Sequence, residues 1–349
     1  MEGNILNVAS FKIVLNETSI PDDLLLNVIE VKFEDEINLP SLFSIKFNIV
    51  DFMKGDTKGI DLKTFMIGDT VKLFLGIDEH VKFLTGEITS LDFSFENAPF
   101  MEIRGYDMLH RLRFGNLRRS FKNMKDSDIA SFIASEINLI PEIEATGTKY
   151  PYIFQNNLSN YEFLIERAKR IGYEMLAYDK TFIFRKSKEN QSPAITLEYR
   201  KTLQSFKLQM KALTEGSKVE MRGWDIKGKK EITSTALKGS ENTKMSGKES
   251  GFEITDSFFK SEGMAFIDNM IIDPDEAENI AKAKFNLMLK EFIAGEGKCI
   301  GNPVIRAGKT IEIKGLGDRI SGIYYIISTV HSIKNGAYNT TFKVRRTGI

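Results

Sequence analysis

The sequence is poor in the side chains that build most metal and redox sites. Its 349 residues include one cysteine, Cys299, three histidines and one tryptophan. A single thiol cannot form an internal disulfide or a cysteine-based metal centre. The three histidines, His80, His110 and His331, are far apart in sequence and lack the spacing of a zinc motif. We therefore expect structural or surface roles for the histidines, and we expect no metal and no cofactor.

The chain also lacks an excess of charge and any long apolar run. Lysine plus arginine and aspartate plus glutamate each number 48, so the formal net charge is zero, whereas proteins that coat nucleic acid usually carry a basic excess. No stretch approaches the roughly 20 apolar residues that cross a bilayer. Residues 1–16 lack the basic start and apolar run of a signal peptide. We expect a protein that folds in the cytosol, with no membrane partner.

What the first hundred residues contain is a dense pattern of β-strands. Apolar residues occupy every second position in the stretches 29–33, 43–49, 71–75 and 91–95. Strict alternation places one face of a strand on a core and the other face in solvent. The region up to residue 107 is therefore predicted to form an antiparallel barrel or sandwich, with these apolar series facing inward.

The middle of the chain changes to a mixed pattern with helices. Apolar residues at helical spacing predict a helix over 126–137. Ser159 and Glu162 have the spacing of a capping box, in which each side chain accepts a hydrogen bond from a backbone N–H at the helix start. Gly172 is placed to end that helix. Residues 173–185 then predict a hairpin.

One further helix is predicted in the last third of the chain. Asp273 is a good N-cap and Pro274 suits the first turn, so the helix should run from 274 to about 293. We expect Gly295 and Gly297 to end it.

Strands are predicted on both sides of that helix. They cover 195–235 and, as three strands, 304–344, where Asn335-Gly336 is a strong hairpin signal. Between them, residues 238–251 are rich in serine, glycine and lysine, which predicts a mobile loop.

Motifs for catalysis are missing. Gly295-Glu296-Gly297 and Gly315-Leu316-Gly317 look like phosphate-binding loops, but neither precedes a helix or has Walker spacing, so we interpret both as turns. The sequence has no G-x-S-x-G nucleophile elbow. A pair of carboxylates for glycan cleavage stays open, because separation in space is not visible in a sequence.

Basic and aromatic residues gather between positions 111 and 125. They are Arg111, Arg113, Phe114, Arg118, Arg119, Phe121, Lys122 and Lys125. Such a mixture can hold single-stranded nucleic acid, or it can dock on an acidic neighbouring protein. We favour docking and expect no stable nucleic-acid complex.

The two β-rich parts of the sequence are similar in size. Each contains a Gly–aromatic–Asp tripeptide, at 105–107 and 223–225. The repeat suggests an internal duplication, but one tripeptide leaves two unrelated β-domains as an equal alternative.

Three longer stretches carry a resemblance to a known family. They are residues 102–139, residues 155–186 (QNNLSNYEFLIERAKRIGYEMLAYDKTFIFRK) and residues 295–346. Their motif residues, mostly turn-making glycines, are Gly105, Tyr106, Asp107, Gly172, Tyr173, Gly301, Asn302, Pro303, Gly308, Gly315, Gly317, Gly322, Tyr324 and His331. The stretches resemble the late control protein D and VgrG-type tail hub proteins of contractile phage tails and type VI secretion. The resemblance is weakest in 1–90 and 235–270.

This resemblance implies an α+β, mainly β fold. Two tube-like antiparallel β-barrel domains, 1–107 and 191–349, would flank a helix- and hairpin-containing domain, 108–190. The implied function is that of a structural baseplate hub and not an enzyme: a homotrimer whose six barrels match a hexameric tail tube. The motif residues would then have structural roles, with no catalytic, cofactor-binding or metal-binding residue among them.

The resemblance also implies the partners. They are sister copies, the tail tube or tube-initiator protein, the spike, and the baseplate wedge and tape-measure proteins. VgrG-type relatives usually continue into a β-helical spike, whereas this sequence ends at Ile349, so we expect the spike to be a separate polypeptide. The protein would be assembled in the bacterial cytoplasm into a virion tail or injection particle. Two alternatives stay open: a tail-associated cell-wall hydrolase, and nucleic-acid binding through 111–125.

Overall fold

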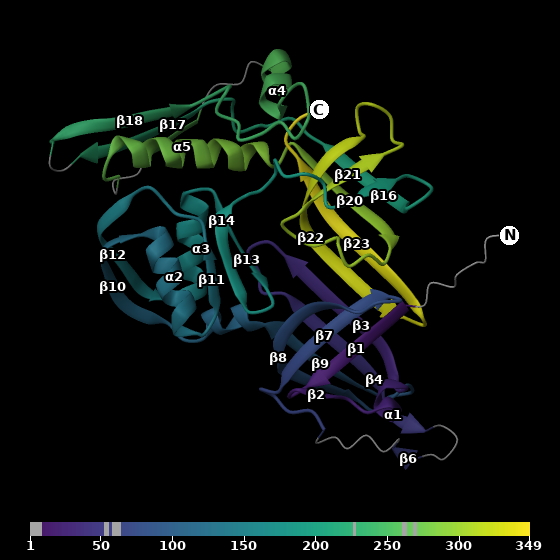
Figure 1. Cartoon of the computed structure of the whole chain (residues 1–349). Coiled ribbons are helices and arrows are strands. Elements are labelled where there is room, and N and C mark those ends of the chain that lie inside the picture. Colours follow the sequence, from purple (N-terminus) through teal and green to yellow (C-terminus); the bar gives the residue numbers. More distant parts are fainter. Residues whose placement is uncertain (1–8, 52–55, 58–63, 226–227, 260–263, 268–270) are drawn as a thin grey trace.

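The protein is mainly antiparallel β-sheet with few helices, as the computed structural model in Figure 1 shows. The structure describes residues 9–51, 56–57, 64–225, 228–259, 264–267 and 271–349. Residues 1–8, where no signal peptide is expected, lie outside these ranges, as do 226–227 within the predicted strands. No helix among the described residues is long and apolar enough to cross a membrane.

The N-terminal part, residues 9–107, is built almost entirely from strands. Its elements are β1 (Ala9–Leu15), β2 (Thr18–Ser19), α1 (Asp22–Leu25), β3 (Val28–Glu36), β4 (Leu42–Asn48), β5 (Val50–Asp51), β6 (Asp56–Thr57), β7 (Thr70–Ile77), β8 (Val81–Ser94) and β9 (Phe100–Asp107). Strands β5 and β6 pair only with each other among the described residues, and the other strands belong to the large sheet described below.

The middle part, residues 108–190, combines helices with two small sheets. Its elements are η1 (a 3-10 helix, Met108–Arg113), β10 (Leu117–Lys125), α2 (Asp126–Glu136), β11 (Ile140–Ile143), β12 (Lys149–Leu158), α3 (Asn160–Arg170), β13 (Tyr173–Tyr178) and β14 (Thr181–Lys186). Strands β10 and β12 form a two-stranded ribbon, and β11, β14 and β13 form a three-stranded sheet.

The C-terminal part, residues 191–349, returns to strands. Its elements are β15 (Thr196–Glu198), β16 (Leu203–Met210), β17 (Val219–Asp225), β18 (Lys230–Ala236), α4 (Gly251–Phe259), β19 (Met264–Ile267), α5 (Pro274–Leu289), β20 (Ile293–Ile300), β21 (Thr310–Lys314), β22 (Gly322–Lys334) and β23 (Ala337–Arg346). Figure 1 shows that α5 and the β17–β18 hairpin reach out over the middle part, where Arg170 of α3 pairs with Glu276 of α5.

A single 13-stranded sheet runs through both β-rich parts. Its order is β16-β20-β23-β22-β3-β4-β9-β8-β7-β1-β2, with β21 beside β22 and β15 beside β21. The link between the two parts is the antiparallel pair β3–β22, in which Glu36 lies opposite Ser328 and Glu30 opposite Lys334. Among the described residues the strand pairings form an open path, and none of them closes either part into a barrel.

Among the described residues, three large apolar cores and one small cluster support this arrangement. One lies in the N-terminal part and is completed by Ile333 and Tyr338 from β22 and β23. The second lies within the middle part, between its helices and small sheets. The third lies in the C-terminal part and includes Phe285 and Phe292. The first core therefore depends on the far end of the chain.

The predicted inward series of the N-terminal strands is confirmed in its centre and wrong at one end. Phe43, Ile45 and Phe47 are completely buried. Phe93 and Phe95 are 41% and 66% exposed. Phe93 lies opposite the buried Met101, so it faces the predicted side of the sheet. The reason for its exposure is that β7 pairs with β8 only as far as Glu87, whereas β8 continues to Ser94, so among the described strands this end of β8 has a neighbour on one side only, β9.

The helix signals of the middle part are confirmed. Before α3, the Ser159 hydroxyl accepts a hydrogen bond from the Glu162 N–H at 3.1 Å, and the Glu162 carboxylate accepts one from the Ser159 N–H at 2.8 Å. Gly172 follows the helix with a φ of +71°, the left-handed conformation that glycine adopts without strain. The predicted hairpin is β13–β14, which turns at Asp179.

The predicted end of α5 is wrong. The helix begins as expected, with the Asp273 carboxylate accepting from the Glu276 N–H at 2.8 Å, but it ends at Leu289. Gly295 and Gly297 lie inside β20 and form neither a helix end nor a turn. A Cβ on Gly297 would stand 2.4 Å from the Phe342 ring. This glycine is needed because an aromatic ring packs directly on the strand backbone. By contrast, Gly315 and Gly317 lie in a turn, with φ of +84° and +78°.

The segment 238–251, predicted to be a mobile loop, is held by the C-terminal tail. The N–H groups of Lys248 and Glu249 both donate to the Ile349 carbonyl, at 2.7 and 3.0 Å. Met245 in its middle is 2% exposed. Its polar composition reflects turns that are hydrogen-bonded to neighbouring segments.

The suggested duplication fails for the two Gly–aromatic–Asp tripeptides. Gly105 lies in β9 of the large sheet, and Asp107 is buried. Gly223 lies in β17, which belongs to a separate three-stranded sheet with β18 and β19. Asp225 is only partly buried and accepts from the Gly228 N–H at 2.9 Å. The two tripeptides therefore occupy unrelated positions.

Candidate functional site

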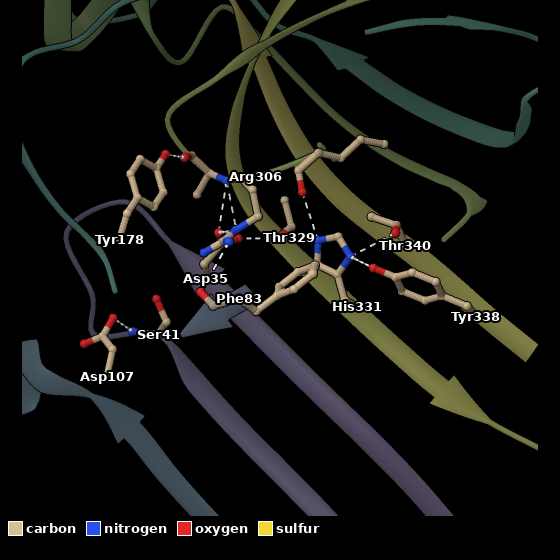
Figure 2. Close-up of polar contacts among 12 residues, drawn as sticks. Asp35, Ser41, Phe83, Asp107, Tyr178, Arg306, Thr329, His331, Tyr338 and Thr340 are labelled. Atoms are coloured by element: carbon tan, nitrogen blue, oxygen red, sulfur yellow. Dashed lines mark hydrogen bonds and ion pairs between the residues drawn. The ribbon is translucent and has the colours of Figure 1, made fainter. Parts of the chain in front are cut away.

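Buried polar residues collect where β3 meets β22. We call Asp35, Arg306, Thr329, His331, Tyr338 and Thr340 the junction cluster. Figure 2 shows them between the strands of the N-terminal and C-terminal parts. Every member is 9% exposed or less, and buried polar groups cost free energy unless each finds a partner.

An ion pair between Asp35 and Arg306 forms one half of the junction cluster. The Arg306 Nε donates to the Asp35 carboxylate at 2.6 Å, and the Thr329 hydroxyl donates to the other carboxylate oxygen (Figure 2). The guanidinium lies over the rings of Phe33 and Phe83, at 4.7 and 5.0 Å. The pair therefore joins residues that are 271 positions apart. Removing one partner alone would leave an uncompensated buried charge.

His331 forms the other half, with a partner for each ring nitrogen. Nε2 lies 2.9 Å from the Ile305 carbonyl, which can only accept, so Nε2 carries the proton. Nδ1 then accepts from the Tyr338 hydroxyl at 2.9 Å, with the Thr340 hydroxyl at 3.1 Å. Burial lowers the pKa of His331 to about 4, so the ring is neutral near pH 7. Its position and contacts are those of a packing residue between β22, β23 and the segment before β21.

Asp107 lies at the end of β9, where the chain passes from the N-terminal part into the middle part. Its carboxylate accepts hydrogen bonds from the N–H groups of Ser41, at 2.8 Å, and Leu109, at 2.9 Å. The second bond caps the 3-10 helix that begins the middle part. Burial raises the pKa of Asp107 to about 6, although both backbone bonds oppose this shift. Gly105 lies just before it, where a Cβ would meet the Phe43 ring at 2.5 Å.

A second buried network joins the middle and C-terminal parts. The Tyr325 hydroxyl donates to the Glu174 carboxylate at 2.5 Å, and Arg345 donates to Glu189 at 3.0 Å. Arg185 donates to the Gly308 carbonyl at 3.0 Å. Burial raises the pKa of Glu174. Together with the junction cluster, this network holds all three parts of the chain against one another.

The groups with shifted pKa values are engaged in contacts inside the chain. The Glu174, Asp107 and His331 side chains are buried and bonded to neighbouring protein atoms. Burial raises the pKa of the Cys299 thiol to about 12, which disfavours a thiolate nucleophile. Among the described residues no group of three or more histidine, cysteine, aspartate or glutamate side chains could hold a metal ion. The contacts of these groups are those of packing between the parts of the chain.

Comparison with models of known protein families shows the family of the chain. A family model described as the Alg8 N-terminal domain matches residues 6–335. The chain belongs to the Alg8 N-terminal domain family. A search of curated proteins found no match to the sequence.

Solved structures show which fold this Alg8-family chain shares. It is similar to the 43 kDa tail protein of prophage MuSo2 from Shewanella oneidensis, with a TM-score of 0.72 and 10% identity, covering 97% of this chain and 98% of that one. It is also similar to a tail protein from Neisseria meningitidis, with a TM-score of 0.71 and 9% identity, covering 97% of each chain.

A type VI secretion component from Escherichia coli is similar as well. Its TM-score is 0.56 at 10% identity, and the match covers 92% of this chain and 74% of that one. At these identities the likeness establishes the fold. The sequence resemblance to phage tail and type VI secretion proteins is therefore confirmed at the level of fold.

Several motif residues of the Alg8-family chain gather around the junction cluster. A Cβ on Gly301 would meet the Tyr338 ring at 2.0 Å, and the Asn302 N–H donates to Thr340 at 3.0 Å. Pro303 follows in the same turn, before Arg306. Gly308, with a φ of +80°, directs its carbonyl to Arg185. With His331, these residues shape the segment that carries Arg306.

The remaining motif residues lie elsewhere. Tyr106 stacks on His110, with ring centroids 6.3 Å apart. A Cβ on Gly172 would stand 3.2 Å from Ala283 of α5, and the Tyr173 hydroxyl donates to the Ala145 carbonyl at 3.0 Å. A last group, at the turns and strands near the C-terminus, consists of Gly315, Gly317, Gly322 and Tyr324. The structure therefore does not bring all the motif residues into one place.

Sequence reasoning missed most of the ion-paired residues of the site. Asp35 could have been found, because it continues the inward series of Val31 and Phe33 on β3, where a carboxylate needs a partner. Arg306 and Arg345 have no such local signal. Their partners lie 271 and 156 positions away in the sequence.

Proposed function

We propose that this chain is a structural baseplate hub of a phage tail or of a phage-like contractile injection system. The observation that carries the proposal is the likeness to a prophage tail protein over almost the whole of both chains. The relation to late control protein D and VgrG-type hubs, seen in the sequence motifs, points the same way.

The proposed hub is a homotrimer that links a hexameric tail tube to a separate central spike. Residues 1–107 and 191–349 would each form a tube-like barrel when curved around a common channel, with 108–190 as the connecting domain. Three copies then present six sheet-based modules to a six-fold ring, which resolves the difference in symmetry. The shared β3–β22 ladder and the buried Asp35–Arg306 pair support this proposal, because they hold the two modules of one chain at a fixed angle.

The remaining partners follow from this position. They are the tail tube or a tube-initiator protein, the spike, and the baseplate wedge and tape-measure proteins. Assembly would take place in the bacterial cytoplasm, and the protein would remain in the tail or injection particle. A structural role without catalysis agrees with the engagement of the buried ionisable groups in contacts between the three parts.

The decisive measurement is the mass of the purified protein and of its complexes. Light scattering after size exclusion should give three times the 39.6 kDa of one chain, alone or with the spike protein encoded beside it. The trimer should also bind the cognate tube protein. A stable monomer that binds neither protein would overturn the proposal.

A second assay separates the hub from the hydrolase alternative. The purified chain should leave peptidoglycan intact in a zymogram at protein amounts at which a known lysozyme gives a clear band. Clearing that follows the monomer peak would replace the hub with a tail-associated hydrolase.

A further inference from the structure

The β10–β12 ribbon of the middle part exposes one face that is both cationic and aromatic. We call Arg118, Ser120, Lys122, Tyr152, Phe154 and Asn156 the ribbon face. Arg118 lies opposite Asn156, Ser120 opposite Phe154, and Lys122 opposite Tyr152. All six are exposed, whereas the intervening Phe121 and Ile153 are buried in the core of the middle part. The ribbon face is therefore a continuous outward surface.

The positive charge of the ribbon face is not neutralised within the chain. Arg118 and Lys122 form no ion pair among the residues that the structure describes, and no member of the face is acidic. The nearby carboxylates are already engaged. Glu136 pairs with Arg119 at 2.8 Å, and Asp128 accepts from the Lys125 N–H at 3.0 Å. An anionic partner would meet two cations without displacing an internal contact.

The aromatic side chains of the ribbon face are ordered against each other. Tyr152 and Phe154 are 54% and 43% exposed, and their rings stack with centroids 6.3 Å apart at 18°. Exposed aromatic rings of this kind supply contact area at low entropic cost, which is why they are enriched in protein interfaces.

One edge of the ribbon is open beside a groove. Strand β10 pairs only with β12 among the described strands, so its other edge has no strand partner. The groove beside this edge has a volume of about 240 Å³ and is lined by β10 residues and by Phe132 of α2. It is distinct from a groove of about 360 Å³ elsewhere in the molecule. No β12 residue lines the smaller groove, so this groove follows the free edge of β10. Phe132 is 48% exposed there.

We propose that this edge binds an extended acidic segment of another protein, which adds to β10 as a third strand. The unpaired backbone of β10 would form the ladder, Phe132 would receive an apolar side chain of the segment, and Arg118 and Lys122 would bind its carboxylates. A nucleic acid could satisfy the two cations, but it has no peptide backbone to pair with a strand edge. The proposal goes beyond the hub function and does not depend on trimer formation.

The test uses the full-length protein and synthetic peptides. The probe is a fluorescent ten-residue peptide in which glutamate alternates with valine. Its controls are the same peptide with lysine in place of glutamate, the same peptide with alternate amides N-methylated, and a dT12 oligonucleotide. The acidic peptide should bind at least about tenfold more tightly than each control, because strand addition needs both charge and free amides.

Two further measurements locate the site. Hydrogen exchange should slow at amides of 117–125 when the acidic peptide is added. The double variant R118E/K122E should lose at least about tenfold in affinity. The matched control K207E/K298E, which changes two exposed lysines on the neighbouring strands β16 and β20 by the same charge, should bind as the parent does. If R118E/K122E proves unstable, R118Q/K122Q serves instead.

Three results would overturn the proposal. The first is equal binding of the N-methylated peptide, which would show charge attraction without a strand ladder. The second is tighter binding of dT12 than of the acidic peptide, which would indicate a nucleic-acid site. The third is no change in amide exchange over 117–125, or an equal loss of binding in K207E/K298E.

Discussion

At the junction cluster Arg306 is 8% exposed and paired with Asp35, whereas on the ribbon face Arg118 is exposed and has no ion pair among the described residues. The same side chain type thus has two different relationships to solvent. At the junction, the charge is paired with a carboxylate inside the chain, and the pair fixes how two parts meet. On the ribbon, the charge stays available for a partner. The comparison separates residues that hold the subunit together from residues that can recognise something else.

The largest effect should follow the loss of Asp35. Asp35→Ala leaves the Arg306 guanidinium buried without its carboxylate, which should lower the free energy of unfolding by about 3–5 kcal/mol. Urea denaturation followed by circular dichroism measures the change. The double variant Asp35→Leu with Arg306→Met is the control, and it should recover most of the loss. If the single variant loses less than about 1 kcal/mol, the junction is not a tightly buried pair.

A change in pH should act on His331 and Asp107 in opposite directions. The unfolded chain protonates a histidine below about pH 6.5, whereas folded His331, with its pKa lowered to about 4, stays neutral. Proton uptake at His331 in the unfolded chain therefore lowers the free energy of unfolding as the pH falls from 6.5 towards 4. Folded Asp107, with its pKa raised to about 6, takes up a proton below pH 6, before the unfolded chain does. Proton uptake at Asp107 in the folded chain therefore raises the free energy of unfolding as the pH falls from 6 towards 4.

The variant Asp107→Asn separates these two contributions. Without the proton uptake of Asp107, the variant should lose about 2–3 kcal/mol relative to the parent between pH 6 and pH 4. Denaturation curves at pH 6.5, 5.5 and 4.5 measure the difference. Asp318→Asn, at an exposed carboxylate in the turn before β22, should follow the parent at all three values. A pH-independent difference for Asp107→Asn would contradict the assignment.

A methyl group at Gly301 tests the packing around the junction without altering charge. The added Cβ would stand 2.0 Å from the Tyr338 ring, whose hydroxyl bonds His331. Gly301→Ala should therefore cost about 1–3 kcal/mol through overpacking, which thermal melting can detect. Gly147→Ala, where no atom lies within 4 Å of the new Cβ, should change stability by less than about 0.5 kcal/mol. Equal melting temperatures for the two variants would argue against close ring packing at Gly301.

The smallest effect on folding is expected on the ribbon face. Arg118→Ala removes an exposed side chain without an ion-pair partner, so the free energy of unfolding should change by less than about 0.5 kcal/mol. The same urea experiment as for Asp35→Ala provides the comparison. A loss above about 1 kcal/mol would mean that Arg118 serves the fold and would remove the contrast between the two regions.

Structural features that depend only on residues close together in the sequence could be predicted. The Ser159 and Glu162 capping box acts within one helical turn, and the Asn335-Gly336 turn needs only two residues that tolerate positive φ, here +51° and +74°. The alternation in β4 likewise records which face of the strand is buried.

Features that depend on distant residues could not be predicted. Gly297 looked like a helix end, because nothing near it in the sequence shows that the Phe342 ring packs on its backbone. Phe93 has the pattern of a core residue, but its burial depends on how far β7 extends beside β8, and that ladder ends at Glu87. The partner of Asp35 lies 271 positions away. Local patterns give direction and periodicity, whereas strand length and charge pairing are set by the assembled sheet.

The β3–β22 ladder has a mechanical consequence. Its hydrogen bonds run across the two strands, from Glu30–Lys334 at one end to Glu36–Ser328 at the other. A pull that drives the two strands past each other along their length loads all of these bonds at once, whereas a pull at right angles opens them one at a time. The connection between the N-terminal and C-terminal parts therefore resists tension most strongly along β3 and β22, and it yields most easily when the two parts are peeled apart.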